Sequence, residues 1–326
     1  MIVPAYWAEA RLQQRTHRRQ ITVRRFGWSD VSLAEAQAHA QARVREAFDR
    51  VVAGEKLPRL ERKVGYGGSQ GLPIREEIVD RHGEAVITRN SYGALCLNTP
   101  DVLFVDVDFD EPVSDGLSSI AVVLVLIAAV ALGLWQRSIG LGIGGFFVGL
   151  IVALFVVGRL RKRAHAANGG PERRARERID AFAAQRPDWH LRVYRTPAGF
   201  RLLAMHRRFA PREPEVVDSF RALGADGLYA TMCAVQNCFR ARVSPKPWRI
   251  GMKRKIKPTV AVWSPEQAEL PERRQWLADY AAAALGHASC RYVASLGDAG
   301  AVDPQAEEVR QLHDALCRAD EELPIA

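Results

Sequence analysis

Two long uncharged stretches in the middle of the chain constrain its fold more than any other feature. Residues 117–135 and 139–158 contain no charged side chain, and only three residues separate them. As a helix, about 20 consecutive apolar residues match the bilayer core, because every backbone polar group is then bonded internally. We therefore expect a two-helix transmembrane hairpin over residues 117–158. Four glycines of the second stretch have the spacing that lets helices approach closely: Gly140, Gly144, Gly145 and Gly149.

Charges beside the hairpin predict its orientation. Basic residues follow the second stretch directly: Arg159, Arg161, Lys162 and Arg163. The loop between the stretches holds only Arg137. Because cytoplasmic flanks are enriched in Lys and Arg, we expect an inner-membrane protein with two spans and both termini in the cytoplasm. Five cysteines in 326 residues exclude a disulfide scaffold and suit a reducing compartment.

The two soluble parts differ in charge. Residues 1–116 hold 16 Lys/Arg and 17 Asp/Glu, whereas residues 159–326 hold 29 and 20. The net charge of +9 therefore arises after the hairpin. This excess favours an anionic partner, either a phosphate-bearing ligand or anionic lipid. With 48% apolar and 25% charged residues, the composition excludes a wholly disordered chain.

Strand and helix patterns alternate on both sides of the hairpin. They predict one α+β domain that the hairpin interrupts, with two independent domains as the alternative. The expected strands are 18–26, 84–89, 93–97, 102–109, 189–196, 200–205, 259–263 and 290–295. The expected helices are 32–53, 73–81, 171–185, 213–223, 226–235, 273–285 and 304–323. The expected organisation is an N-terminal α/β region (1–83), a first part of the domain (84–116), the hairpin (117–158) and the remainder with a basic segment and a C-terminal helix (159–326).

Asp106 and Asp108 are the first candidates for chemistry. They lie at the acidic end of the strand pattern 102–109, which is otherwise apolar like a central strand. Residues i and i+2 of a strand share a face, so the two carboxylates repel each other unless a cation lies between them. Mg²⁺ or Mn²⁺ suits such oxygen ligands and supports phosphoryl transfer. We expect Asp106 and Asp108 to be metal-binding and catalytic, with Asp110 or Glu111 as a third ligand; the alternative is an acidic turn.

A family resemblance rests on two motifs. Residues 103–109, LFVDVDF, resemble the first catalytic motif of the archaeo-eukaryotic primase superfamily. Residues 196–201, TPAGFR, resemble its second motif, with Arg201 where that family has histidine. The resemblance covers residues 84–264 with the hairpin excised. It implies an RRM-like mixed sheet with flanking helices, metal-dependent nucleotidyl transfer, and phosphate contacts from Thr196 and Arg201. The late acidic residue of that family has no match.

The segment 238–257 is the most basic part of the chain. It holds eight Lys/Arg, with Phe239 and Trp248 among them. Cations suit phosphates, and aromatic rings stack on bases. The candidate phosphate-binding residues here are Arg240, Arg242, Lys246 and Arg249. The alternatives are contact with lipid headgroups and uncommitted surface charge.

The cysteines offer a weaker metal hypothesis. Cys233 and Cys238 are closely spaced, and they form a zinc site only if the fold brings Cys96 and Cys290 near. Small buried core residues are the simpler interpretation. The glycine-rich residues 65–71 lack the Gly-Lys-Ser/Thr of a phosphate-binding loop and read as an ordinary loop.

Taken together, these patterns favour a membrane protein with a cytoplasmic domain that binds Mg²⁺ or Mn²⁺ and the phosphates of nucleotides or nucleic acids. If it is active, it is a nucleotidyltransferase. One alternative is a catalytically inactive, membrane-tethered scaffold or sensor. Another is a different Asp-x-Asp enzyme, such as a metal-dependent glycosyltransferase.

Overall fold

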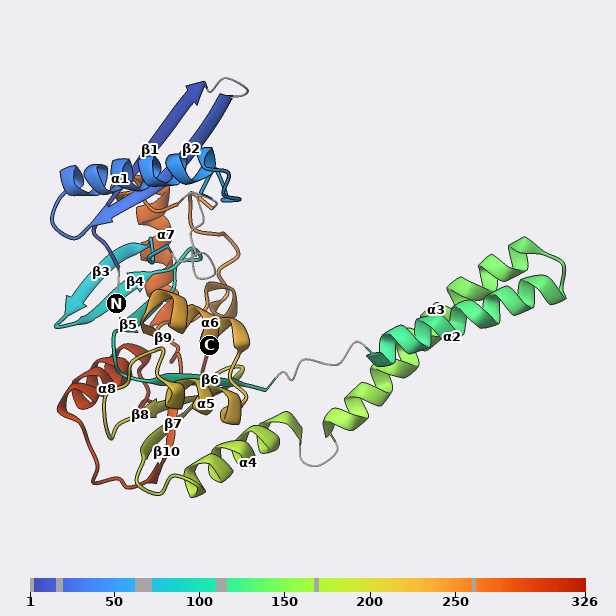
Figure 1. Ribbon diagram of the computed structural model, residues 1–326. Helices are drawn as coiled ribbons and strands as arrows, with labels where there is room; N and C mark the ends of the chain where they lie inside the picture. Colours follow the sequence, from blue (N-terminus) through green and yellow to red (C-terminus); the bar gives the residue numbers. More distant parts are fainter. Residues whose placement is uncertain (1–2, 16–19, 62–71, 110–115, 167–169, 260–261) are drawn as a thin grey trace.

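The computed structural model describes residues 3–15, 20–61, 72–109, 116–166, 170–259 and 262–326 (Figure 1). The protein is α+β, 45% helical and 23% strand, as the sequence predicts. The described strands are β1 (Tyr6–Arg15), β2 (Gln20–Ser29), β3 (Glu77–His82), β4 (Ala85–Arg89), β5 (Leu95–Thr99), β6 (Phe104–Asp108), β7 (His190–Arg195), β8 (Gly199–Ala204), β9 (Phe239–Arg242) and β10 (Arg291–Gly297). The described helices are α1 (Leu33–Val52), α2 (Gly116–Trp135), α3 (Ile139–Ala166), α4 (Gly170–Ala184), α5 (Pro214–Leu223), α6 (Gly227–Gln236), α7 (Pro271–Ala284), α8 (Pro304–Cys317) and the 3₁₀ helices η2 (Pro247–Ile250) and η3 (Pro265–Glu269).

Two four-stranded sheets form the body, in the orders β10-β7-β8-β6 and β3-β4-β5-β9. Every ladder between the described strands is antiparallel, so the expected mixed sheet is wrong. Each sheet combines strands from before and after α2 and α3. The largest core cluster does the same, since it joins Leu97 and Phe104 to Phe200 and Phe239. The chain thus builds one core from segments on both sides of the hairpin.

Strand β6 lies at the edge of the four-stranded sheet β10-β7-β8-β6, which is called the β6 sheet below. β6 pairs only with β8 among the described strands, although its apolar sequence predicts a central strand. Its apolar side chains are nevertheless buried, and the Tyr229 hydroxyl donates to the Phe104 carbonyl at 3.0 Å. Side-chain cover from α6 therefore replaces a second neighbouring strand.

The N-terminal residues form a separate layer. β1 and β2 pair along their whole length, and α1 packs on them around Ile21, Val23, Val44 and Phe48. The Ser32 hydroxyl accepts from the Glu35 amide at 3.2 Å, which caps α1 where the sequence predicts its start. This layer lies at one end of the molecule, beside the β3 sheet (Figure 1).

The expected elements and those of the structure differ at several places. Residues 73–81 do not form the expected helix, because residues from Glu77 pair with β4 as β3. β1 and β9 were missed, and β9 reads as basic sequence although Phe239, Arg240 and Ala241 are buried. The expected strand 259–263 contains residues outside the described part, as does the glycine-rich loop 65–71, and no strand is described beside 260–261.

Helices α2 and α3 form an antiparallel hairpin that projects away from the sheets (Figure 1). One described helix segment, Ile139–Arg159, is long and apolar enough to cross a membrane. Its most apolar part has a mean hydropathy of 2.5 and contains no buried residue. The described apolar part of α2, Ser119–Trp135, is shorter.

The glycine contacts in the hairpin differ from the expectation. A Cβ on Gly142 would lie 3.3 Å from the Gly133 Cα, and Cβ atoms on Gly145 and Gly149 would touch α2 side chains. Gly144 has nothing within 4 Å. The seam therefore follows Gly142, Gly145 and Gly149 and leaves Gly144 facing outward.

The turn from β7 to β8 requires glycine at position 199. The Gly199 amide donates to the Thr196 hydroxyl at 3.0 Å, and the Thr196 amide donates to the Gly199 carbonyl at 2.9 Å. A Cβ on Gly199 would lie 2.2 Å from the Val107 carbonyl oxygen. Backbone atoms of β6 cannot yield without moving the strand.

We predict that Gly199→Ala lowers the free energy of unfolding by about 3 kcal/mol, because the added methyl group forces β6 and β8 apart. Chemical unfolding of the detergent-purified protein measures this change. The control is Gly227→Ala at the start of α6, where nothing lies within 4 Å of the new Cβ. That variant should be neutral or more stable by up to about 1 kcal/mol. Equal losses in both variants would contradict the steric argument.

Candidate functional site

Asp106 and Arg201 form a cross-strand pair in the β6 sheet. They are directly opposite in the register of β6 and β8. Arg201 Nε and Nη2 donate to the two Asp106 carboxylate oxygens at 2.7 and 3.0 Å, a bidentate arrangement. The Arg201 side chain is 4% exposed and that of Asp106 33%. Arg201 is thus directed at Asp106, although we expected it to contact phosphate.

Further contacts occupy the rest of the Arg201 guanidinium. Nη1 donates to the Arg242 carbonyl at 2.8 Å and approaches His313 Nε2 at 3.4 Å. Burial acts to lower the pKa of Arg201, but the Asp106 carboxylate outweighs it and raises that pKa. Arg201 therefore stays charged and binds β6, β8 and β9 together.

Asp108 lies at the exposed end of β6, on the same face as Asp106. Its charge acts on Lys246 and Arg249, which come from the loop after β9. The proposed third ligands, Asp110 and Glu111, are outside the described residues. Among the described residues, Asp106 and Asp108 do not belong to any group of three metal-ligating side chains.

Two further expected phosphate ligands, besides Arg201, have structural contacts instead. Thr196 closes the β7–β8 turn, and its hydroxyl both donates to and accepts from Gly199. Arg240 is 7% exposed; its Nη2 donates to both Glu76 carboxylate oxygens at 2.7 and 2.9 Å, and its Nη1 donates to Asn98 Oδ1. Both residues stabilise the sheets beside the site, and neither presents its polar atoms as a phosphate ligand on the surface of the site.

Lys246, Arg249 and Arg242 form a concentrated positive group. The pKa of Lys246 is lowered, first because the side chain is partly buried and then because Arg242 and Arg249 lie near it. Asp108 and Asp106 oppose this shift. Burial and then Arg242 lower the pKa of Arg249 in the same way. Crowded cations of this kind favour a bound anion, because its charge relieves their repulsion.

An aromatic cavity of about 350 Å³ adjoins these cations. Tyr92, Trp248 and Trp276 line it together with Lys253, Arg254 and Lys255. Tyr92 and Trp248 meet edge to face at 5.2 Å, and the Lys246 ammonium lies 5.5 Å from the Trp248 ring centre. Trp248 is 58% exposed, which is unusual for so large an apolar side chain. A second hollow, of about 780 Å³, shares Arg254, Lys255, Thr259 and Trp276 with it.

Helix α7 holds the loop around this cavity in place. The Tyr280 hydroxyl donates to the Pro245 carbonyl at 2.7 Å and accepts from Ser244, whose oxygen accepts from the Leu95 amide. The Trp276 indole donates to the Arg254 carbonyl at 2.8 Å and stacks on Tyr280 with ring centres 5.2 Å apart. The loop is therefore pre-formed at both ends.

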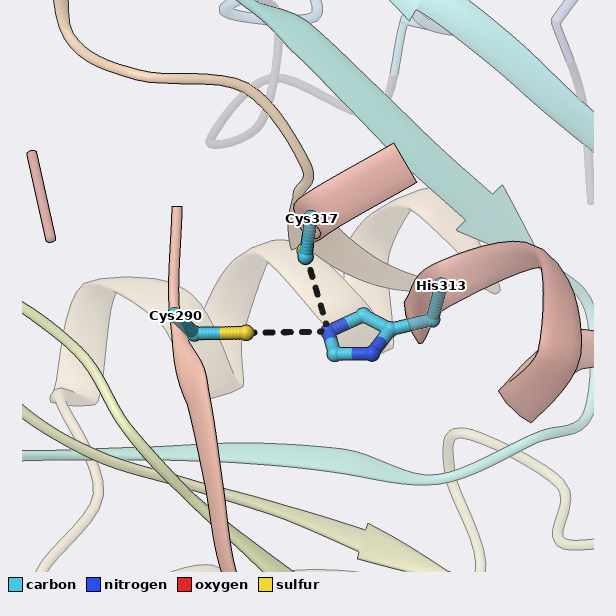
Figure 2. Close-up of side chains that lie close together, drawn as sticks. All are labelled: Cys290, His313 and Cys317. Atoms are coloured by element: carbon cyan, nitrogen blue, oxygen red, sulfur yellow. Dashed lines mark hydrogen bonds between the residues drawn. The ribbon is translucent and has the colours of Figure 1, made fainter. Parts of the chain in front are cut away.

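A second cluster lies in the interior behind Arg201. Cys290, His313 and Cys317 are buried, and their ligand atoms lie within 4.8 Å of one another. Figure 2 shows both sulfur atoms directed at the same imidazole nitrogen. The hydrogen bond from Cys317, with the charges of His313 and Arg201, lowers the pKa of Cys290 against the effect of burial. Burial acts to lower the pKa of His313, but Cys290 and Asp314 raise it.

Cys233 and Cys238 do not gain, from the described residues, the further ligands that the alternative zinc hypothesis needs, and they are small buried core residues, as the simpler interpretation expects. Cys290 lies with His313 and Cys317, and in the described part of the chain neither Cys233 nor Cys238 joins a group of three possible ligands. All five cysteines are buried, and none of them is in a disulfide. His313 and Cys317 are four residues apart on α8, so their shared face was readable from the sequence.

No protein-family model matches the chain, and no curated protein or solved structure is significantly similar to it.

We predict that Arg240→Met lowers the free energy of unfolding by about 3–5 kcal/mol, because Glu76 is then left buried without its charge partner. Urea unfolding followed by tryptophan fluorescence measures the loss. The matched change Arg249→Met, in the partly exposed loop, should stay within about 0.5 kcal/mol of the wild type. A stable Arg240→Met protein would return Arg240 to the candidate phosphate ligands.

Proposed function

We propose that this protein is a membrane-tethered module that binds nucleotides or single-stranded nucleic acid without using Asp106 and Asp108 as a two-metal catalytic centre. It corresponds to the scaffold or sensor among the functions that the sequence leaves open. The ligand's phosphates would lie on the cations of the loop 246–257, and its bases would stack on the aromatic rings beside them.

The observation that carries this proposal is the make-up of the aromatic cavity. Its volume lies within the usual range for small-molecule sites, about 300–1,000 Å³. Lys257 pairs with Glu272 at 3.0 Å, whereas no described carboxylate pairs with Lys253, Arg254 or Lys255. Exposed aromatic rings beside such cations provide the two interactions that nucleic acid strands use, stacking and phosphate attraction.

The ion pair of Asp106 argues against catalysis. A metal at Asp106 and Asp108 would have to compete with the Arg201 guanidinium, which takes both Asp106 oxygens and is buried. Removing that partner would leave a buried cation, which costs several kcal/mol. A nucleotidyltransferase, as the primase resemblance implies, would need this pair to open.

The exposed hairpin supports the membrane part of the proposal. Apolar side chains along α2 and α3 stand free of the sheets, with Ile127, Val148, Ile151 and Phe155 each at least 60% exposed. Monomeric soluble proteins rarely expose apolar surface of this extent, and a bilayer would cover it. We propose that both helices cross the inner membrane, with the sheets in the cytoplasm as the basic flank predicts.

We predict that the detergent-purified chain binds single-stranded oligonucleotides in a salt-dependent manner. Trp248→Ala should weaken binding by roughly 5- to 150-fold, the loss of about 1–3 kcal/mol for one stacked base, and Trp248→Phe should retain most of it. Replacing Lys253, Arg254 and Lys255 by Ala should reduce the slope of log affinity against log salt by about 0.7 for each lost phosphate contact. Fluorescence anisotropy at several salt concentrations measures both effects.

Three comparisons delimit this prediction. Arg221→Ala removes an exposed cation of α5 outside the cavity and should leave binding unchanged. Mononucleotides and anionic vesicles, used as competitors, separate nucleotide, strand and lipid binding. Binding that strictly requires Mg²⁺ and is lost in Asp108→Asn would contradict the non-catalytic proposal and favour a nucleotidyltransferase.

We predict that the loop between α2 and α3 is exposed on the outer side of the inner membrane. The native cysteines are buried, so reporter cysteines can be read against a low background. A membrane-impermeant maleimide should label Gln136→Cys in spheroplasts, and Gln41→Cys and Ala299→Cys only after lysis. Protection of Gln136→Cys until lysis, in a membrane-bound protein, would show that the hairpin does not cross.

A further inference from the structure

The interior cluster of Cys290, His313 and Cys317 has no role in the proposed binding site. Cys290 directly precedes β10, while His313 and Cys317 are one turn apart on α8. We propose that these three side chains bind a zinc ion that fastens α8 to the β6 sheet. The proposal is independent of nucleotide binding and of the membrane hairpin.

The donor separations agree with tetrahedral coordination. With Zn–S and Zn–N bonds of about 2.3 and 2.1 Å, tetrahedral angles put a sulfur and a nitrogen ligand about 3.6 Å apart. His313 Nε2 lies 3.5 Å from Cys317 Sγ and 3.9 Å from Cys290 Sγ. Both sulfur–nitrogen separations are therefore close to the tetrahedral value, and all three ligand atoms lie within 4.8 Å of one another.

The surroundings of His313 orient it as a metal ligand. Its Nδ1 lies 2.9 Å from Asp314 Oδ1, so Nδ1 carries the proton and Nε2 presents its lone pair to the two sulfur atoms. A carboxylate behind the imidazole is the usual outer partner of a metal-bound histidine. Asp314 is itself held by Arg192 at 3.1 Å and by Arg310 at 2.9 Å. The orienting group is thus held from β7 and from within α8 itself.

The charges also fit a divalent ion. Two buried thiolates would cost much free energy without compensation, and Zn²⁺ cancels them. Arg201, whose Nη1 is 3.4 Å from His313 Nε2, brings one positive charge that it shares with Asp106, so two thiolates still need a further cation. Thiolate and imidazole ligands select zinc over Mg²⁺ or Mn²⁺. Among the described residues three ligands converge, so a water molecule completes the tetrahedron.

The test starts with the metal content of the full chain. Protein purified in detergent without chelator should contain about one zinc per chain by inductively coupled plasma mass spectrometry. Cys290→Ser and Cys317→Ser should lose that zinc. Cys96→Ser changes a buried cysteine of the other sheet and should retain it. Zinc that persists in the double variant Cys290→Ser/Cys317→Ser would overturn the proposal.

A measurement on the wild-type chain removes the dependence on variants that fail to fold. Exchange of zinc for Co²⁺ should give the intense visible bands of a tetrahedral site and a thiolate-to-cobalt charge-transfer band. Asp314→Asn should lower the zinc affinity by about 10- to 100-fold in competition with a chromophoric chelator. A metal-free wild type with no cobalt spectrum, or an intact mass two hydrogens lighter from a Cys290–Cys317 disulfide, would overturn the proposal.

Discussion

The ion pair between Asp106 and Arg201 is the interaction on which the rest of the structure depends. It joins β6 to β8 across the register, and through Arg201 it reaches the Arg242 carbonyl of β9 and the imidazole of α8. Segments from both sides of the hairpin therefore meet at one buried guanidinium. The same contact occupies the carboxylate that a catalytic metal would need. The ion pair that stabilises the core therefore also opposes metal binding at the adjoining surface.

Local patterns were sufficient for most helices and for the strands next to clear turns. The Ser32 cap and the Pro-Ala-Gly turn after β7 lie where the sequence places them, because each is a contact between near neighbours in the chain. β3 and β9 were not predicted as strands, because they form strands only by pairing with segments elsewhere in the chain. Arg240 sits in a buried strand only because Glu76 neutralises it, and no local pattern reveals that pair.

Only part of the candidate site could be predicted from the sequence, for the same reason. The basic segment and Trp248 could be identified from composition, but the cavity they line needs Tyr92 and Trp276 from distant elements. The role of Arg201 could not be deduced, since a phosphate ligand and a buried ion-pair partner look alike in sequence. The sequence indicates only part of the Cys290 cluster. The helical spacing of His313 and Cys317 predicts a shared face, whereas Cys290 joins them only through the fold.

The position of the hairpin between β6 and α4 has a consequence for biosynthesis. β6 leaves the ribosome before the hairpin, and its partner β8 leaves after it. Until then the first half carries unpaired strands and half a core, which is the kind of surface that aggregates. The sheets can form only after the apolar helices have been synthesised, because β8 follows them in the chain. The synthesis of α2 and α3 thus sets the earliest time at which the sheets on either side of them can form.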